Sequence, residues 1–127
     1  MDFRLAKPVG EYLERKGLLG DCDVISVAGG VKNIRGPEDL HGEDNVLSQL
    51  KISADLHNIC KVILSNHIDC GAYGGSSRFT SVEEERSFHI AEMRRAKAVI
   101  HDLFPALQIS IALGIIRGEE FEIEEME

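Results

Sequence analysis

The sequence predicts an α/β fold: a mostly parallel sheet with helices on both faces and a short antiparallel edge strand at the C-terminal end. Continuous apolar runs, at residues 61–65 and 108–113 for example, are typical of strands that are buried on both faces. These runs alternate with stretches of helical periodicity, which is the pattern of parallel strands connected by crossover helices.

Residues 1–127 are predicted to form a single domain, because a chain of this length is too short for two independent cores. Apolar residues make up 43% and charged residues 28% of the chain, and these globular values exclude a disordered or fibrous protein. No run approaches the roughly 18 apolar residues of a membrane helix, and the first residues lack a signal-peptide core. We therefore expect a cytoplasmic protein without a membrane partner.

The charge balance argues against a nucleic-acid partner, because 14 basic and 22 acidic residues leave a net charge of −8. Three cysteines in a chain without export features predict free thiols rather than disulfides. Packing, metal binding and nucleophilic chemistry remain open for these thiols. Cys22 and Cys60 precede predicted strands, at the end of the sheet away from the motif turns described below, so we expect both to be structural.

The first half of the chain is predicted to contain a helix at 8–16, a strand at 23–28, a loop at 31–44 and a helix at 45–58. Pro8 suits the first turn of the first helix, and Gly17 is a good stop signal. The β-branched run DVISVA ends at Gly29-Gly30, as a buried strand followed by a tight turn would.

The second half is predicted to contain a strand at 61–65, a helix that follows Ser81, a strand at 108–113 and an edge strand that includes Phe121 and Ile123. Ser81 and Glu84 form a capping-box signature, and Pro105 ends a helix of about 22 residues. The core-facing stripe of this helix is Met93, Ala96, Ile100 and Leu103. Arg117-Gly118 is a turn signal before the edge strand.

His67 and Cys70 are the strongest candidates for chemistry. They lie in the turn after the strand at 61–65, and a two-residue spacer lets an imidazole and a thiolate converge on one metal ion. The carboxyl ends of parallel strands are where α/β proteins bind ligands, and Gly29-Gly30 falls at the same kind of place. Gly71 permits close approach of the backbone. The alternative is an ordinary turn histidine beside a buried thiol.

These motifs resemble those of the β-class carbonic anhydrases. The run VILSNHIDCGAYGG is similar to that family's second metal motif, in which an apolar strand leads into His-x-x-Cys-Gly. DVISVAGGVKNI resembles the family's strand that ends in Ala-Gly-Asn, with Gly30 in place of the asparagine. The opening MDFRL resembles the Cys-x-Asp-Ser-Arg motif without its cysteine and with Phe3 in place of serine. The order of the motifs and the helices between them agree over most of the chain.

The resemblance implies that His67 and Cys70 are ligands of Zn²⁺. It implies that Asp2 either accepts a hydrogen bond from zinc-bound water or occupies the fourth coordination position. Arg4 would hold Asp2 in a bidentate pair and keep that carboxylate ionised. The backbone at Gly30 and Gly71 would bind the substrate, CO₂ or bicarbonate.

The family's third ligand, a cysteine, would fall immediately before Met1. We therefore expect that the chain as given either lacks its true N-terminus or has lost a complete site. Asp2 could replace the missing ligand if it is held close to His67 and Cys70. The resemblance also implies a homodimer or a higher homo-oligomer.

The leading functional hypothesis is a zinc-dependent lyase that hydrates CO₂ reversibly to bicarbonate by zinc-bound hydroxide. A second hypothesis is a non-catalytic relative, a binding or regulatory protein with an incomplete metal site. In a third, Cys70 is a nucleophile and His67 its base. Asp69 is expected to form the turn rather than bind the metal, Tyr73 and Arg78 have open roles, and His89 is expected to lie outside the site.

Overall fold

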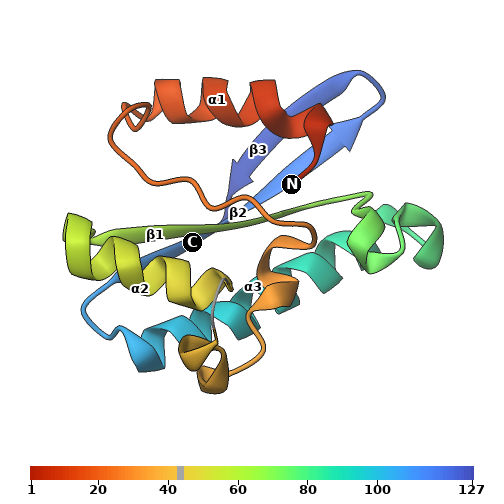
Figure 1. The fold of residues 1–127 in the computed structure, drawn as a ribbon. Helices are drawn as coiled ribbons and strands as arrows, with labels where there is room; N and C mark the ends of the chain where they lie inside the picture. Colours follow the sequence, from red (N-terminus) through yellow and green to blue (C-terminus); the bar gives the residue numbers. More distant parts are fainter. Residues whose placement is uncertain (43–44) are drawn as a thin grey trace.

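The computed structural model describes residues 1–42 and 45–127 (Figure 1). Its helices and strands are α1 (Ala6–Arg15), α2 (Val46–His57), β1 (Lys61–His67), α3 (Val82–Leu103), β2 (Gln108–Arg117) and β3 (Glu120–Glu125). Short 3-10 helices lie in the connections: η1 (Phe3–Leu5), η2 (Gly30–Asn33), η3 (Pro37–His41), η4 (Gly71–Tyr73) and η5 (Ser76–Arg78). Among these helices, none combines the length and the hydropathy that crossing a bilayer requires.

The sheet has the strand order β1-β2-β3. β1 is parallel to β2, with His67 beside Gly114, and α3 makes the crossover between them. β2 is antiparallel to β3, which confirms the predicted C-terminal edge strand. The prediction of a mostly parallel sheet is wrong, because only one of the two strand pairings in the described part of the chain is parallel.

Helices cover both faces of this sheet (Figure 1). α1 lies on one face, while α2 and α3 lie on the other. α1 is attached to β3, because the Tyr12 hydroxyl donates to Glu125 and Lys16 Nζ lies 2.8 Å from the same carboxylate. The most deeply buried apolar side chains lie between the sheet and α2 and α3: Ile34, Leu47, Met93, Ile100, Ile111 and Leu113.

The three predicted helices are confirmed. α1 and α2 lie within two residues of their expected bounds, and α3 has 22 residues. Ser81 caps α3 by accepting the Glu84 N–H at 3.1 Å, but the Glu84 carboxylate accepts from Thr80 and does not close the capping box. Residues 31–42 of the predicted loop contain η2 and η3, and its last two residues, 43–44, lie outside the described residues.

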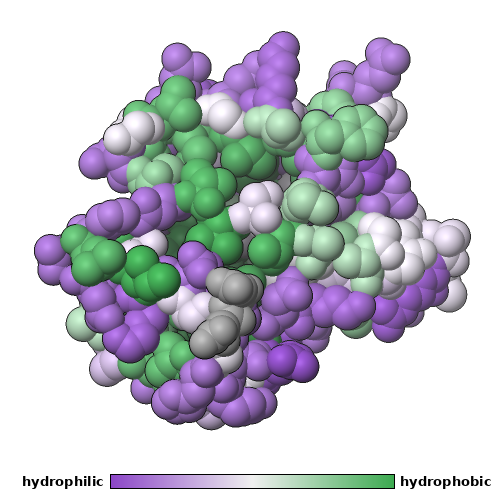
Figure 2. Space-filling model, in the orientation of Figure 1, coloured by the Kyte–Doolittle hydropathy of each residue, from purple (hydrophilic) through white to green (hydrophobic). Residues whose placement is uncertain are grey.

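The predicted strand at 23–28 is wrong. Residues 23–27 have no regular structure, and Val24 and Ile25 are 63% and 39% exposed. A strand needs a neighbour for its backbone hydrogen bonds, and in the structure of residues 1–42 and 45–127 none pairs with this segment. Asp23 instead accepts from Ser53 Oγ of α2 at 2.7 Å. Figure 2 shows apolar side chains gathered on the face that this segment crosses, between α1 and α2.

Candidate metal and substrate site

The turn after β1 brings His67 and Cys70 to one place. Ile68 N donates to Gly114 O at 2.9 Å, so pairing with β2 continues one residue past the strand. Asp69 then adopts a left-handed conformation (φ 55°), and η4 begins after Cys70. The exposed fractions of His67 and Cys70 are 8% and 6%. The local sequence therefore builds a tight turn with an imidazole and a thiol on its inner side.

One pocket collects three segments that are far apart in the chain. It is lined by Met1, Asp2, Phe3, Arg4, Ala28, Gly29, His67, Cys70, Gly71 and Ala72. Five of the six residues that the sequence singled out, Asp2, Arg4, His67, Cys70 and Gly71, therefore share this pocket. Gly30 does not line it, and the neighbouring Gly29 does.

Gly30 has a different place, behind the pocket wall. Its φ is +50°, and a Cβ there would lie 2.7 Å from Asn66 Oδ1 and 2.9 Å from Ser65 O. Only glycine adopts this conformation easily and leaves this space open. Gly30 thus lets the turn at Gly29 pack directly against β1.

Arg4 binds two carboxylates at the mouth of the pocket. Its Nε and Nη2 donate to the Asp2 oxygens Oδ1 and Oδ2 at 3.0 and 2.7 Å, which is the bidentate pair that the resemblance implied. Its Nη1 also donates to Asp69 Oδ2 at 2.8 Å. These hydrogen bonds lower the pKa of Asp2 to about 2 and raise the pKa of Arg4. Asp2 is therefore a carboxylate, not a carboxylic acid, at neutral pH.

His67 presents a free nitrogen to this carboxylate. Its Nδ1 lies 2.7 Å from Ile68 O, and since a carbonyl oxygen only accepts, Nδ1 carries the proton. In the neutral ring Nε2 is then unprotonated, and it lies 3.8 Å from Asp2 Oδ2. Burial lowers the pKa of His67, which favours this neutral form. A ring that donates one N–H to a backbone carbonyl and exposes the other nitrogen is typical of metal-binding histidines.

The position of the His67 ring also depends on Gly114 of β2. A Cβ at Gly114 would lie 2.9 Å from His67 Cβ and 3.5 Å from Asn66 O. Because Gly114 has no side chain, there is room for the Cβ atom of His67 beside it.

The side chains in this pocket include types that bind zinc, but too few of them come together to complete a zinc site. A neutral imidazole and a free thiol are typical zinc ligands, and structural or catalytic sites use three or four of them. Within residues 1–42 and 45–127, however, no three His, Cys, Asp or Glu side chains come together as a metal-binding group. Asp2 Oδ1 and Oδ2 both accept from Arg4. Cys22 and Cys60 are exposed. Cys60 directly precedes the first residue of β1, at the other end of that strand from His67.

Three buried residues behind the pocket were not predicted from the sequence: Asn66, Glu85 and His89. Glu85 and His89 precede Met93 by eight and four residues on α3, so they extend the predicted core-facing stripe toward the start of the helix. Polar residues at core-facing positions of a helix indicate a buried polar contact, and this was the signal that could have identified them. Tyr73, the last residue of η4, is buried, and the Arg78 guanidinium lies 4.8 Å from the centre of the Phe88 ring.

Comparison with known proteins shows the family of the chain. A family model described as "Putative carbonic anhydrase" matches residues 1–127. An uncharacterized protein of Rickettsia bellii is 29% identical over 112 residues, which are 86% of this chain and 68% of that protein. An uncharacterized protein of Rickettsia conorii is 26% identical over 129 residues, which are 99% of this chain and 69% of that protein. No solved structure matches the chain. The chain belongs to the family of carbonic anhydrase-like proteins that this model describes.

Proposed function

We propose that this protein is a zinc-dependent lyase of the β-class carbonic anhydrase type, which interconverts CO₂ and bicarbonate. The observation that supports this most directly is the Asp2 carboxylate, held by Arg4 at 3.8 Å from the free Nε2 of His67. Cys70 and Gly71 line the same pocket. Membership of the family supports the same chemistry.

His67 Nε2 and the Cys70 thiolate would hold the zinc ion. When bound, zinc supplies Lewis-acid chemistry that lowers the pKa of water to about 7. A tetrahedral site needs a further protein donor. We infer that this donor is either Asp2, after it releases Arg4, or a side chain from outside residues 1–127, such as the cysteine of the family's first motif.

Asp2 acts in this proposal as a hydrogen-bond acceptor. With a pKa of about 2 it is ionised at every physiological pH, so it orients a water proton and does not store one. Arg4 fixes the direction of the carboxylate by binding both oxygens. The apolar atoms of Ala28 and Ala72 and the bare backbone of Gly29 and Gly71 suit a small uncharged substrate such as CO₂.

The deciding experiment measures zinc content and the rate of CO₂ hydration on the same preparations. The chain of 127 residues is compared with one extended upstream by the cysteine of the family's first motif. We expect the extended chain to retain zinc through dialysis and to hydrate CO₂, and we expect Asp2→Asn to keep the metal and lose most of the rate. Stoichiometric zinc without CO₂ hydration would rule out the lyase and leave the metal site intact.

A second candidate function is a non-catalytic relative that binds bicarbonate or a protein partner. It is favoured by the absence of a three-donor group among the described residues. Its distinguishing result is binding of bicarbonate to the chain by calorimetry, with no hydration activity in either the short or the extended form.

A further inference from the structure

Glu85 is a buried carboxylate that the proposed chemistry does not use. It lies in the first turn of α3 and is 2% exposed. Oε1 accepts the Asp69 N–H at 2.7 Å, and Oε2 accepts the Ser76 hydroxyl at 2.7 Å. Burying a carboxylate is costly unless it is hydrogen-bonded. Both of its oxygens bind the segment that contains Cys70 and follows His67.

His89 lies one helical turn further along α3 and is fully buried. Its Nδ1 lies 3.3 Å from Asn66 Nδ2, and because an amide nitrogen only donates, Nδ1 is the acceptor. The ring proton of a neutral His89 is therefore on Nε2, which lies 3.8 Å from Glu85 Oε1. Nε2 has no hydrogen-bond partner among the residues that the structure describes.

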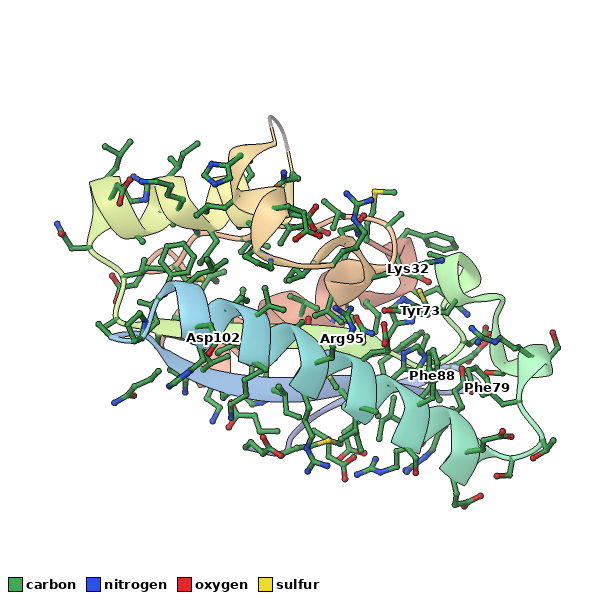
Figure 3. All side chains as sticks on the ribbon, turned by 90° about the horizontal axis from the view of Figure 1, so that it is seen from below. Lys32, Tyr73, Phe79, Phe88, Arg95 and Asp102 are labelled. Atoms are coloured by element: carbon green, nitrogen blue, oxygen red, sulfur yellow. The ribbon has the colours of Figure 1, made fainter. Side chains whose placement is uncertain are left out.

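Aromatic rings hold His89 in this position. The centre of its ring is 5.0 Å from that of Tyr73 and 5.5 Å from that of Phe88, both nearly perpendicular to it. Figure 3 shows Tyr73, Phe79 and Phe88 together near the first turns of α3. Burial lowers the pKa of His89 and so favours the neutral ring. The ring is therefore held by packing against Tyr73 and Phe88 and at Nδ1 by a hydrogen bond.

Asn66 connects this pair to the opposite wall of the pocket. Its Oδ1 accepts the Val31 N–H at 3.2 Å, directly after the Gly29-Gly30 turn. A row of buried polar groups thus runs through the interior: Val31, Asn66, His89, Glu85 and Asp69. Hydrogen bonds join its neighbours except His89 and Glu85, which are 3.8 Å apart. One end belongs to the wall at Gly29, and the other lies between His67 and Cys70.

We propose that Glu85 and His89 are positioning residues of the metal site: Glu85 holds the His67–Cys70 turn, and His89 holds the Asn66 amide that binds the wall next to Gly29. The inference rests on the proposed function, because it assigns ligand roles to His67 and Cys70. Metal ligands must be held within about 0.5 Å of their working geometry, and residues behind them supply that precision. Glu85 does so at the peptide N–H of Asp69, halfway between the two ligands.

The test uses the full chain with Cys22→Ser and Cys60→Ser, so that Cys70 is its one thiol. In this background we compare Glu85→Ala, Glu85→Gln and His89→Phe with the control Glu83→Gln, an exposed carboxylate in the same turn of α3. Three quantities are measured: Zn²⁺ affinity by chelator competition, the thiolate-to-cobalt absorption band after loading Co²⁺, and the hydrogen exchange rate of the Asp69 amide without metal. Circular dichroism first establishes that each variant is folded.

We expect Glu85→Ala to lose about 10- to 100-fold in Zn²⁺ affinity, to shift the cobalt band and to speed exchange of the Asp69 amide. Glu85→Gln keeps an oxygen that accepts the Asp69 N–H, so most of the affinity should return. His89→Phe keeps the aromatic packing and removes the contacts to Asn66 and Glu85, and we expect a smaller loss. Glu83→Gln should match the parent chain in all three measurements.

The inference is overturned if folded Glu85→Ala matches Glu83→Gln in affinity, cobalt spectrum and Asp69 exchange. If Glu85→Ala does not fold, the same comparison is made with His89→Phe and decides in the same way. If neither the parent chain nor the same chain extended upstream by the cysteine of the family's first motif binds Zn²⁺ or Co²⁺, the proposed function fails and the metal-site role fails with it. The metal-free exchange rate alone then decides whether Glu85 holds the turn. Faster exchange at Asp69 then supports the role of Glu85, and an unchanged rate refutes it.

Discussion

Arg4 Nη1 lies 2.8 Å from Asp69 Oδ2, and this contact ties the start of the chain to the turn after β1. The same guanidinium binds both oxygens of Asp2. The position of Asp2 relative to His67 therefore depends on one side chain that holds both carboxylates.

Replacing Arg4 by lysine should disturb this arrangement. A single ammonium group cannot reproduce the planar fork that binds two carboxylates, so Asp2 should lose its fixed direction. For a chain that hydrates CO₂, we expect kcat/KM to fall by about 10- to 100-fold, since displacements near 1 Å at a reacting group have effects of that size. Stopped-flow hydration assays measure it. Arg15→Lys at the exposed end of α1 is the control, and an Arg4→Lys enzyme as fast as this control would contradict the role of Arg4.

Zinc retention should depend on His67 and Cys70 individually. Each contributes one donor atom, so His67→Ala or Cys70→Ala should remove the stoichiometric zinc of the extended chain. Atomic emission after dialysis measures the metal. Cys22→Ser and Cys60→Ser change exposed thiols away from the pocket and should leave the zinc content unaltered. Zinc that survives both alanine changes would show that the metal binds elsewhere.

Gly30→Ala should destabilise the protein by about 1–3 kcal/mol, because a left-handed backbone and a crowded Cβ both oppose alanine. The added carbon would lie 2.7 Å from Asn66 Oδ1. Gly10→Ala in α1, where a Cβ would meet nothing within 4 Å, should instead stabilise by up to about 1 kcal/mol. Urea denaturation compares the free energies of unfolding. Equal and small changes at both positions would contradict the close approach of Gly30 to β1.

Asp39 should make stability depend on pH in acid. Its carboxylate is 5% exposed and accepts the Arg35 N–H at 2.8 Å and Arg35 Nη2 at 2.9 Å. These hydrogen bonds lower the pKa of Asp39 below its ordinary 3.8. Because the folded state binds this proton less readily than the unfolded state, the stabilisation is complete above about pH 4 and is lost as the pH falls further.

The measurement is the difference in unfolding free energy between the parent chain and Asp39→Asn, followed from pH 6 to pH 3. We expect this difference to be largest near pH 6 and to shrink at the acid end. Glu38→Gln, an exposed neighbour, should show a small difference at every pH. A difference for Asp39→Asn that stays constant with pH would mean that its carboxylate is not preferentially ionised in the folded protein.

The features that the sequence predicted correctly are determined locally. The apolar run of β1 and the residues that follow it carry local strand and turn signals, so His67 and Cys70 could be placed together. The strand expected at 23–28 failed because a strand also needs a partner far away in the chain. Nothing in the composition of that run shows whether such a partner lies beside it.

The network behind the pocket could not be assembled from the sequence, although one signal was present. Glu85 and His89 share a helix face with Met93, and a charged residue at such a position indicates a buried polar contact. The identity of its partners depends on how α3 crosses β1. Asn66, at the end of β1, gave no sign that its amide would meet a histidine from α3.

Gly114 limits where a site of this kind could be transplanted. The imidazole of His67 occupies its position only because the paired residue on β2 has no side chain. A designer who grafts the His-x-x-Cys turn onto another sheet must therefore transfer a glycine from the adjacent strand as well. Any larger residue there would crowd His67 Cβ and displace the side chain that carries the imidazole.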